Sequence, residues 1–260
     1  MSDEIIFCET PEDVAEAAAE LIFEKQTEAV AERGVFRIAL SGGNTPKLLY
    51  QQLASEEWRE EISWDRWEVY WSDERAVPPD HTDSNYHLAH STFLCKVPVP
   101  KVFQMISPRF SGGTKGGLDQ AAQNYETLLK DKFGQSLPVF DLILLGVGPD
   151  GHTASLFPEH HALESQNLVD VVDRNSTDLN VASLPPNLDL GVRGLKRLTL
   201  TLRVLNAARA ILFLITGEEK AQAVKEILEL GNRDLPATLV NPEGGECFWI
   251  LDEAASHLLS

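Results

Sequence analysis

Short apolar runs alternate along the chain with longer segments in which apolar residues recur every three or four positions. The short runs are typical of strands buried on both faces of a parallel sheet, and most end in a turn rich in Gly, Ser, Thr or Asp. They lie at 36–40, 67–71, 142–145, 210–215 and 247–251. This alternation predicts an α/β fold.

The longer segments have the period of amphipathic helices. The first runs from Pro11 to Arg33, with Thr10 and Asp13 forming its N-terminal cap and Gly34 ending it. Further helices are predicted at 47–53, 84–94, 118–133 and 218–230. No repeat, low-complexity tract or linker divides the chain, so we expect residues 1–260 to form a single domain.

Three segments depart from this pattern. Residues 198–202 alternate strictly between Leu and Thr, which predicts a strand with one face in water. Residues 165–197 are rich in Asn, Asp, Ser and Pro, which predicts an irregular, exposed insertion. Residues 107–117 are rich in Gly and indicate a surface loop.

Composition limits the kinds of protein that this chain can be. No apolar segment reaches the length of a bilayer, and the first ten residues carry acids rather than a basic stretch, so we expect a cytoplasmic protein. The three cysteines lie far apart, which favours reduced, buried thiols. His160 and His161 suggest an exposed turn. Without further ligands at suitable spacing they predict no metal site.

The formal net charge of −18 argues against nucleic acid or an anionic membrane as a partner. An anionic small molecule would need cations and helix N-termini gathered locally, because the rest of the surface repels it.

The segment from Asp141 to Pro158 carries the strongest chemical signal. Its apolar run ends at Gly146, and three glycines within six residues then frame a loop that leads to His152. Open α/β sheets place ligands at the carboxyl ends of their strands. Histidine has an unperturbed pKa near neutrality, so His152 is a candidate general base. The alternative is a histidine that only makes hydrogen bonds within the loop.

The strand at 36–40 runs into a Ser-Gly-Gly-Asn-Thr-Pro turn followed by a helix. Exposed backbone N–H groups, two hydroxyls and the helix dipole there would form a phosphate cradle, and its residues are Ser41, Gly42, Gly43 and Thr45. A simple tight connection is the alternative.

Charged residues at two other strand ends are further candidates. Arg75 is suited to bind phosphate bidentately, and Asp73 to orient a histidine or a substrate hydroxyl, although a solvated loop is the alternative. Lys220 falls in the first turn of a predicted helix, where the dipole disfavours a cation unless an anion shares the site. A surface position without function is the alternative for Lys220.

Together these motifs resemble those of the 6-phosphogluconolactonases, in the glucosamine-6-phosphate deaminase/6-phosphogluconolactonase family. The matching stretches lie in the family's order and span most of the chain: 41–46, 71–78, 141–158 and 197–220. The resemblance implies a doubly wound, mostly parallel sheet with helices on both faces, in a modified Rossmann-like fold. It also implies hydrolysis of 6-phosphoglucono-1,5-lactone in the oxidative pentose phosphate pathway, without metal or organic cofactor.

In such a reaction His152 would take a proton from water, with Asp73 placing the imidazole or a hydroxyl. Arg75 and Lys220 would hold the phosphate together with the Ser41–Thr45 turn. Backbone N–H groups in the loop of Gly148, Asp150 and Gly151 are candidates for stabilising the oxyanion. We expect a small-molecule sugar phosphate as the partner and a monomer or weak oligomer as the assembly.

Two related classes fit less well. In the deaminases the corresponding loop has a carboxylate where this chain has Phe157, and typically a Tyr in place of Arg75. Sugar-phosphate-sensing transcription regulators need an attached DNA-binding module, for which this acidic chain has no room before its first helix. Within the lactonase pattern, Arg203 stands where Pro is common, and 185–196 is longer than usual.

Overall fold

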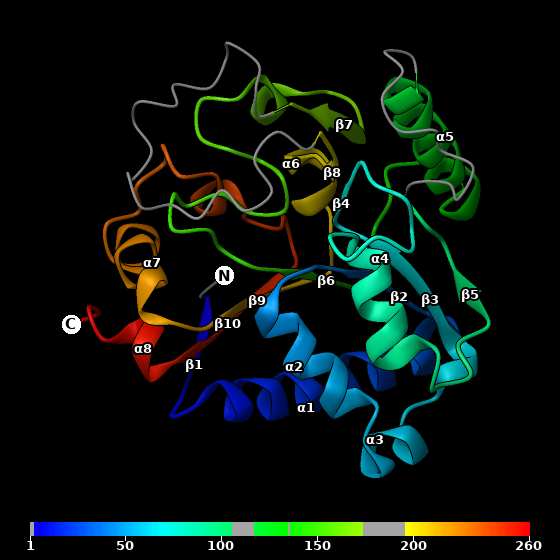
Figure 1. Cartoon of the computed structure of the whole chain (residues 1–260), viewed down its shortest axis with the longest axis horizontal. Coiled ribbons are helices and arrows are strands. Elements are labelled where there is room, and N and C mark those ends of the chain that lie inside the picture. Colours follow the sequence, from blue (N-terminus) through cyan, green and yellow to red (C-terminus); the bar gives the residue numbers. More distant parts are fainter. Residues whose placement is uncertain (1–2, 106–116, 135, 174–195) are drawn as a thin grey trace.

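The computed structural model describes residues 3–105, 117–134, 136–173 and 196–260. A central sheet crosses the described part of the molecule, and each pair of neighbouring strands in it is parallel (Figure 1). Its order is β1 (Glu4–Cys8), β10 (Glu246–Asp252), β9 (Ala210–Ile215), β6 (Leu142–Leu145), β2 (Phe36–Leu40), β3 (Trp67–Trp71) and β5 (Lys101–Val102). The prediction of a mostly parallel sheet is confirmed, and the first and last strands pair with each other.

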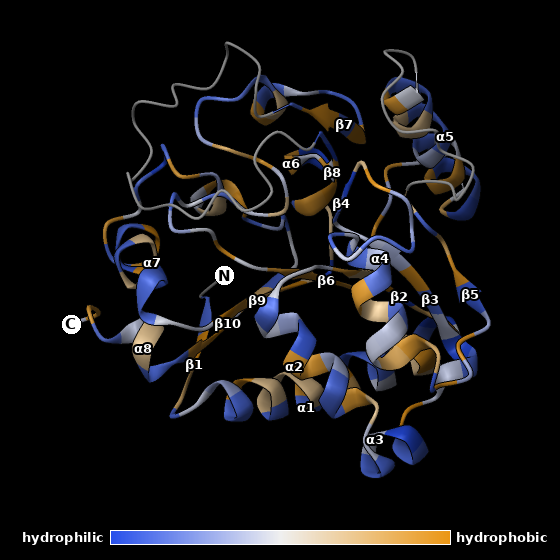
Figure 2. Cartoon of the chain, viewed as in Figure 1, coloured by the Kyte–Doolittle hydropathy of each residue, from blue (hydrophilic) through white to orange (hydrophobic). Residues whose placement is uncertain are grey.

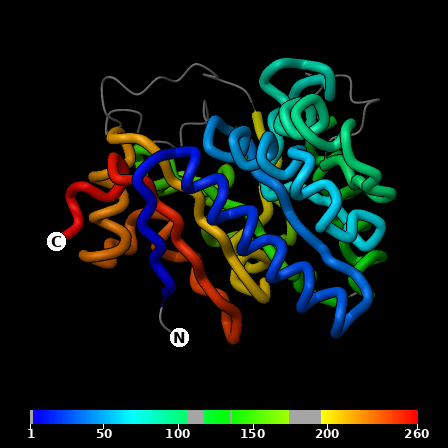
Figure 3. The backbone as a smooth tube through the Cα atoms, turned by 90° about the horizontal axis from the view of Figure 1, so that it is seen from below, coloured from blue at the N-terminus to red at the C-terminus, as the bar shows by residue number. Residues whose placement is uncertain are grey.

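Helices cover both faces of this sheet, as predicted (Figure 1). On one face lie α1 (Pro11–Arg33), α2 (Asn44–Leu53), α3 (Glu56–Glu61) and α4 (Asn85–Ala89), the last continued by a π-helical turn at His90–Leu94. Figure 3 shows α1 lying across this face. The other side carries α5 (Gly117–Lys132), α6 (Leu202–Leu205) and α7 (Ala221–Leu228), and α8 (Glu253–Ser256) follows β10.

The long helix α1 has the ends that its sequence predicts. Thr10 accepts a hydrogen bond from the backbone N–H of Asp13, whose side chain in turn accepts one from the Thr10 N–H. Gly34 ends the helix in the left-handed conformation. Helix α2 begins at Asn44, earlier than predicted, because Pro46 fits within a first helical turn.

A second, antiparallel sheet was not predicted from the sequence. It consists of β4 (Asp73–Arg75), β8 (Arg197–Leu200) and β7 (Val169–Val172). The expectation of a water-exposed face at 198–202 is wrong, because Thr199 and Thr201 are as fully buried as Leu198 and Leu200. The expectation of an irregular, exposed insertion at 165–197 is wrong at 169–172, which form β7 with Val169 and Val172 buried, and at Arg197, which begins β8 and is buried. The rest of that segment from 174 to 195, and the predicted loop from 107 to 116, lie outside the described residues.

Two smaller expectations also fail. His160 is buried and its Nδ1 accepts a hydrogen bond from the Ala162 N–H, so the two histidines do not form a simple exposed turn. All three cysteines are free, but Cys95 is exposed and only Cys247 is buried.

In the described ranges, no helix combines the length and the apolar character needed to cross a membrane.

The strands form the core, as the hydropathy colouring in Figure 2 shows. Contacts between core elements also fix the strand ends that lead into the polar edge. The Tyr125 hydroxyl of α5 accepts a hydrogen bond from the Trp71 N–H at the end of β3 (3.0 Å). The next residue, Ser72, donates its N–H to the Leu40 carbonyl of β2 (2.8 Å). The ends of β2 and β3 are therefore held in register with each other.

Candidate functional site

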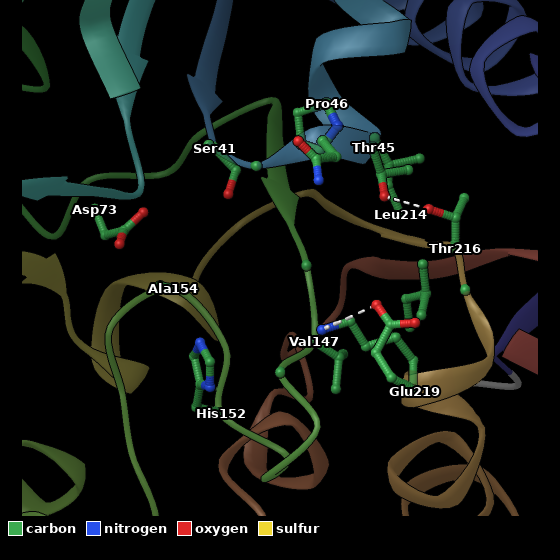
Figure 4. Close-up of a pocket in the computed structure, with 18 of the residues that line it drawn as sticks. Ser41, Thr45, Pro46, Asp73, Val147, His152, Ala154, Leu214, Thr216 and Glu219 are labelled. Atoms are coloured by element: carbon green, nitrogen blue, oxygen red, sulfur yellow. Dashed lines mark hydrogen bonds and ion pairs between the residues drawn. The ribbon is translucent and has the colours of Figure 1, made fainter. Parts of the chain in front are cut away.

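The carboxyl ends of the parallel strands meet at one edge of the sheet, as expected for a ligand site in an open α/β fold. A cavity of about 450 Å³ opens there. Nine of the eleven candidate residues line it: Ser41, Gly42, Gly43, Thr45, Asp73, Arg75, Gly148, His152 and Lys220. Figure 4 shows Asp73 and His152 toward one side of the cavity, and Thr45, Thr216 and Glu219 toward the other.

The imidazole of His152 is held by contacts on three sides. Its Nδ1 forms a hydrogen bond with Oδ1 of Asp150. Its ring packs on Phe157, with the two ring centroids 4.6 Å apart. A Cβ on Gly148 would fall 2.0 Å from Nδ1, so only glycine leaves room for the ring there. Because the Asp150 carboxylate accepts the Nδ1 proton, Nε2 is the nitrogen that can accept a proton.

The glycine-framed loop supplies this geometry by bonding to itself. The Gly148 N–H donates to the carbonyl of His152 (2.8 Å), and the Gly151 N–H donates to the carbonyl of Gly148 (2.9 Å). Gly151 has a φ of 75°, which favours glycine. Since both N–H groups are engaged within the loop, this geometry does not support their candidate role as oxyanion donors. Asp150 and Gly151 are not among the residues that line the cavity; they shape the loop behind it.

Asp73 is buried at the edge of the cavity and its carboxylate contacts neutral donors. Oδ1 accepts a hydrogen bond from Asn85 Nδ2 (3.0 Å), and Oδ2 accepts one from the Ser155 hydroxyl (2.6 Å). Of the two aspartates, it is therefore Asp150 that bonds to the imidazole of His152.

The loop after β4 is fixed by the carboxylate of Glu74, which is itself buried. It accepts backbone hydrogen bonds from Arg75, Asn85 and Tyr86, each 2.8 Å long. Burial raises the pKa of Glu74, and these backbone donors oppose that rise. Asn85 in turn lies so close to Gly42 that a Cβ on Gly42 would fall 1.8 Å from its Oδ1. Gly42 therefore allows the turn after β2 to approach Asn85, which bonds to Asp73.

Two guanidinium groups line the cavity from neighbouring strands. Arg75 of β4 lies opposite Arg197 of β8 in the antiparallel pairing. Arg75 Nη1 donates to the Asp83 carbonyl (2.9 Å). Arg197 is buried, lies over the ring of Phe157 (5.5 Å) and approaches the Ser155 hydroxyl (3.4 Å). Sequence reasoning missed Arg197, although its position directly before the Leu-Thr-Leu strand was a usable signal.

The turn after β2 meets the turn after β9 across the cavity. The hydroxyls of Thr45 and Thr216 form a hydrogen bond (2.6 Å; Figure 4). Gly43, with a φ of 107°, is the N-cap of α2 and directs the start of that helix at the cavity. The N–H of Gly217 is held by the carboxylate of Asp252 (3.1 Å). This side of the cavity is therefore formed by two turns, whereas the sequence suggested one.

Lys220 ends a short 3₁₀ turn, Glu218–Lys220, and lies at the start of α7. Its ammonium forms an ion pair with Glu219 (3.9 Å). Burial lowers the pKa of Lys220, while the charges of Glu219 and Asp150 oppose that fall. A partly buried ammonium in a cavity is favourable for binding an anion.

The cavity thus collects three cations and a histidine in a protein that is strongly acidic overall. Among the residues that the structure describes, no three His, Cys, Asp or Glu side chains are grouped as metal ligands would be.

A model of the family described as glucosamine-6-phosphate isomerases/6-phosphogluconolactonase matches residues 9–249. The chain belongs to this family. A 6-phosphogluconolactonase from Homo sapiens is 38% identical, over 96% of this chain and 91% of that protein. The enzyme of the same name from Synechocystis is 40% identical, over 90% of this chain and 88% of that protein.

Solved structures of this family share the fold. A 6-phosphogluconolactonase from Leishmania guyanensis superposes with a TM-score of 0.83 at 28% identity, and each chain is fully covered. The 6-phosphogluconolactonase from Trypanosoma brucei gives a TM-score of 0.82 at 29% identity, with 100% of this chain and 99% of that chain covered. A monomeric glucosamine-6-phosphate deaminase, at 24% identity and a TM-score of 0.75, shows the common fold alone.

Proposed function

We propose that this chain is a 6-phosphogluconolactonase that hydrolyses 6-phosphoglucono-1,5-lactone to 6-phosphogluconate in the oxidative pentose phosphate pathway. The single observation that carries the mechanism is the cavity in which an oriented imidazole and three cationic side chains converge. The names of the curated relatives support the substrate.

The chemistry begins at Nε2 of His152. Asp150 holds the proton on Nδ1, so Nε2 accepts a proton from water as that water attacks the lactone carbonyl. The imidazolium then returns the proton to the ring oxygen as the C–O bond breaks. The negative charge of Asp150 stabilises the imidazolium between these two steps, in the manner of the aspartate in a catalytic triad.

Arg75 and Lys220 bind the phosphate, as the sequence suggested, and Arg197 binds it with them. The turn from Ser41 to Thr45 contributes hydroxyls and the N-terminus of α2. Gly148 and Gly151 use their N–H groups within the loop, so we do not assign these groups to the tetrahedral oxygen.

Asp73 is proposed to accept a hydrogen bond from a sugar hydroxyl. Its carboxylate lines the cavity and is already fixed by Asn85 and Ser155, so it is a rigid acceptor. Such an acceptor selects a polyhydroxylated ring over an apolar ester.

The test is acid release from freshly generated 6-phosphoglucono-1,5-lactone, measured against the uncatalysed rate in buffer. Glucosamine 6-phosphate serves as the competing substrate. We expect rapid acid release and no ammonia. Ammonia release from glucosamine 6-phosphate without lactone hydrolysis would contradict the proposal.

A further inference from the structure

The phosphate side of the cavity already contains an acidic side chain. Glu219 lines the cavity beside Thr216 (Figure 4). Its Oε1 lies 3.9 Å from Nζ of Lys220, and a Cβ on Gly217 would fall 2.6 Å from its Oε2. The carboxylate therefore lies over the backbone of the Thr216–Gly217 turn and beside a cation that we assign to the phosphate.

This contact is one that a ligand can displace. The Glu219 side chain is 64% exposed, whereas that of Lys220 is 22% exposed. An exposed ion pair at this separation contributes little free energy, and the freed carboxylate regains full hydration when it swings outward. Lys220 is less free to move, because its side chain is partly enclosed by the cavity.

We infer that Glu219 is a tethered competitor that sets the affinity of this cavity for phosphorylated ligands. In the empty site its carboxylate neutralises part of the charge of Lys220. A phosphate dianion displaces it by offering a stronger charge to the same ammonium. A ligand without phosphate gains nothing from Lys220. Competition by the Glu219 carboxylate therefore weakens the binding of phosphorylated ligands only, and the reaction product is one of these.

The adjacent glutamate is a matched control. Glu218 lies in the same 3₁₀ turn and carries the same charge, but it is not among the described residues that line the cavity. Glu219→Gln and Glu218→Gln change the net charge equally. A difference between them therefore reports position and not overall charge.

Binding of 6-phosphogluconate and of inorganic phosphate is measured by isothermal titration calorimetry for both variants and the wild type. We expect Glu219→Gln to tighten both by about 2- to 5-fold, and Glu218→Gln to change them by less than about 1.5-fold. The advantage of Glu219→Gln should shrink as salt is raised. Equal shifts in the two variants, or none in Glu219→Gln, would overturn the inference.

The inference depends on the proposed function for the identity of its ligand, and kinetics separate the two. If the wild type hydrolyses the lactone, Glu219→Gln should lower KM in proportion to the binding change, with kcat within about twofold. KM for unphosphorylated glucono-1,5-lactone should not change. A wild type without lactonase activity whose Glu219→Gln variant still binds phosphate more tightly would refute the function and leave the inference standing.

Discussion

Arg75 and Arg197 lie directly opposite each other in the antiparallel pairing of β4 with β8, and both line the cavity. Like charges at opposed positions on neighbouring strands destabilise a sheet. Arg75 donates a hydrogen bond to the Asp83 carbonyl, and Arg197 lies over the ring of Phe157. An anionic ligand that contacts both guanidinium groups would reduce this repulsion as it binds.

Replacing Arg75 with Ala should mainly weaken substrate binding. A charge-assisted hydrogen bond contributes about 1.5–3 kcal/mol, so we expect KM to rise about 10- to 100-fold with kcat changed by less than about threefold. Thermal unfolding should show an unchanged or slightly higher Tm without ligand, and less stabilisation by phosphate. Arg66→Ala, at an exposed ion pair with Asp65, is the control. A fall in kcat at unchanged KM would contradict this role.

Replacing His152 with Ala should remove the proton acceptor. We expect kcat to fall by about 10²- to 10⁴-fold, because general base catalysis is lost. KM should be nearly unchanged, because the side chains that bind the phosphate are still present. His257→Ala, at an exposed position near the C-terminus, should behave as the wild type. Unchanged lactonase kinetics in purified His152→Ala would remove the proposed base.

Replacing Asp150 with Asn should disturb the imidazole without removing it. The amide can present its NH₂ group to Nδ1 and so favour the wrong tautomer, and it no longer stabilises an imidazolium. We expect kcat to fall by about 10- to 10³-fold, with KM within about threefold. Asp150→Glu should retain more activity than Asp150→Asn. Asp73→Asn should instead raise KM. If the two asparagine variants gave the reverse pattern, Asp73 would be the residue that orients the base.

Gly148→Ala tests the position of the same ring from its other side. The new Cβ would fall 2.0 Å from Nδ1 of His152, so the imidazole must move away. We expect kcat to fall at least about 10-fold, because small displacements of a catalytic group are costly. Gly146→Ala meets only the Leu214 carbonyl, at 3.9 Å, and should lose much less activity. Equal kcat values for the two variants would show that the ring position is not limiting.

Phosphate affinity should depend on alkaline pH through Lys220. Burial lowers the pKa of Lys220 in the free enzyme below its ordinary value of 10.5, and a bound phosphate raises it again. Affinity is therefore full below the free-enzyme pKa and is lost as pH rises through it. Lys220→Arg keeps its charge and should flatten this profile in titrations with 6-phosphogluconate. Lys225→Arg is the control. If affinity fell with pH as steeply in Lys220→Arg as in the wild type, Lys220 would not be the group whose titration controls phosphate binding.

Local signals sufficed for much of the scaffold. The bounds of α1 match the prediction because its capping residues and its terminal glycine act over three or four residues. The strands at 36–40, 67–71, 142–145 and 210–215 were recognisable because a strand buried on both faces is apolar at most of its positions. The small sheet was not recognisable, since β4 is a charged tripeptide whose strand character comes only from pairing with β8, more than a hundred residues away.

The sequence by itself determined where the apolar strands of the central sheet end and which polar residues follow them. Parallel strands direct those ends to one edge, so Ser41, Asp73, His152 and Lys220 had to lie near one another. Only the tertiary structure decided that Asp150 contacts the imidazole, that Asp73 faces the cavity beside Asn85 and Ser155, and that Arg197 joins Arg75. These contacts depend on strand register and on close packing between distant segments. Neither produces a periodic pattern of residues that can be recognised in the sequence.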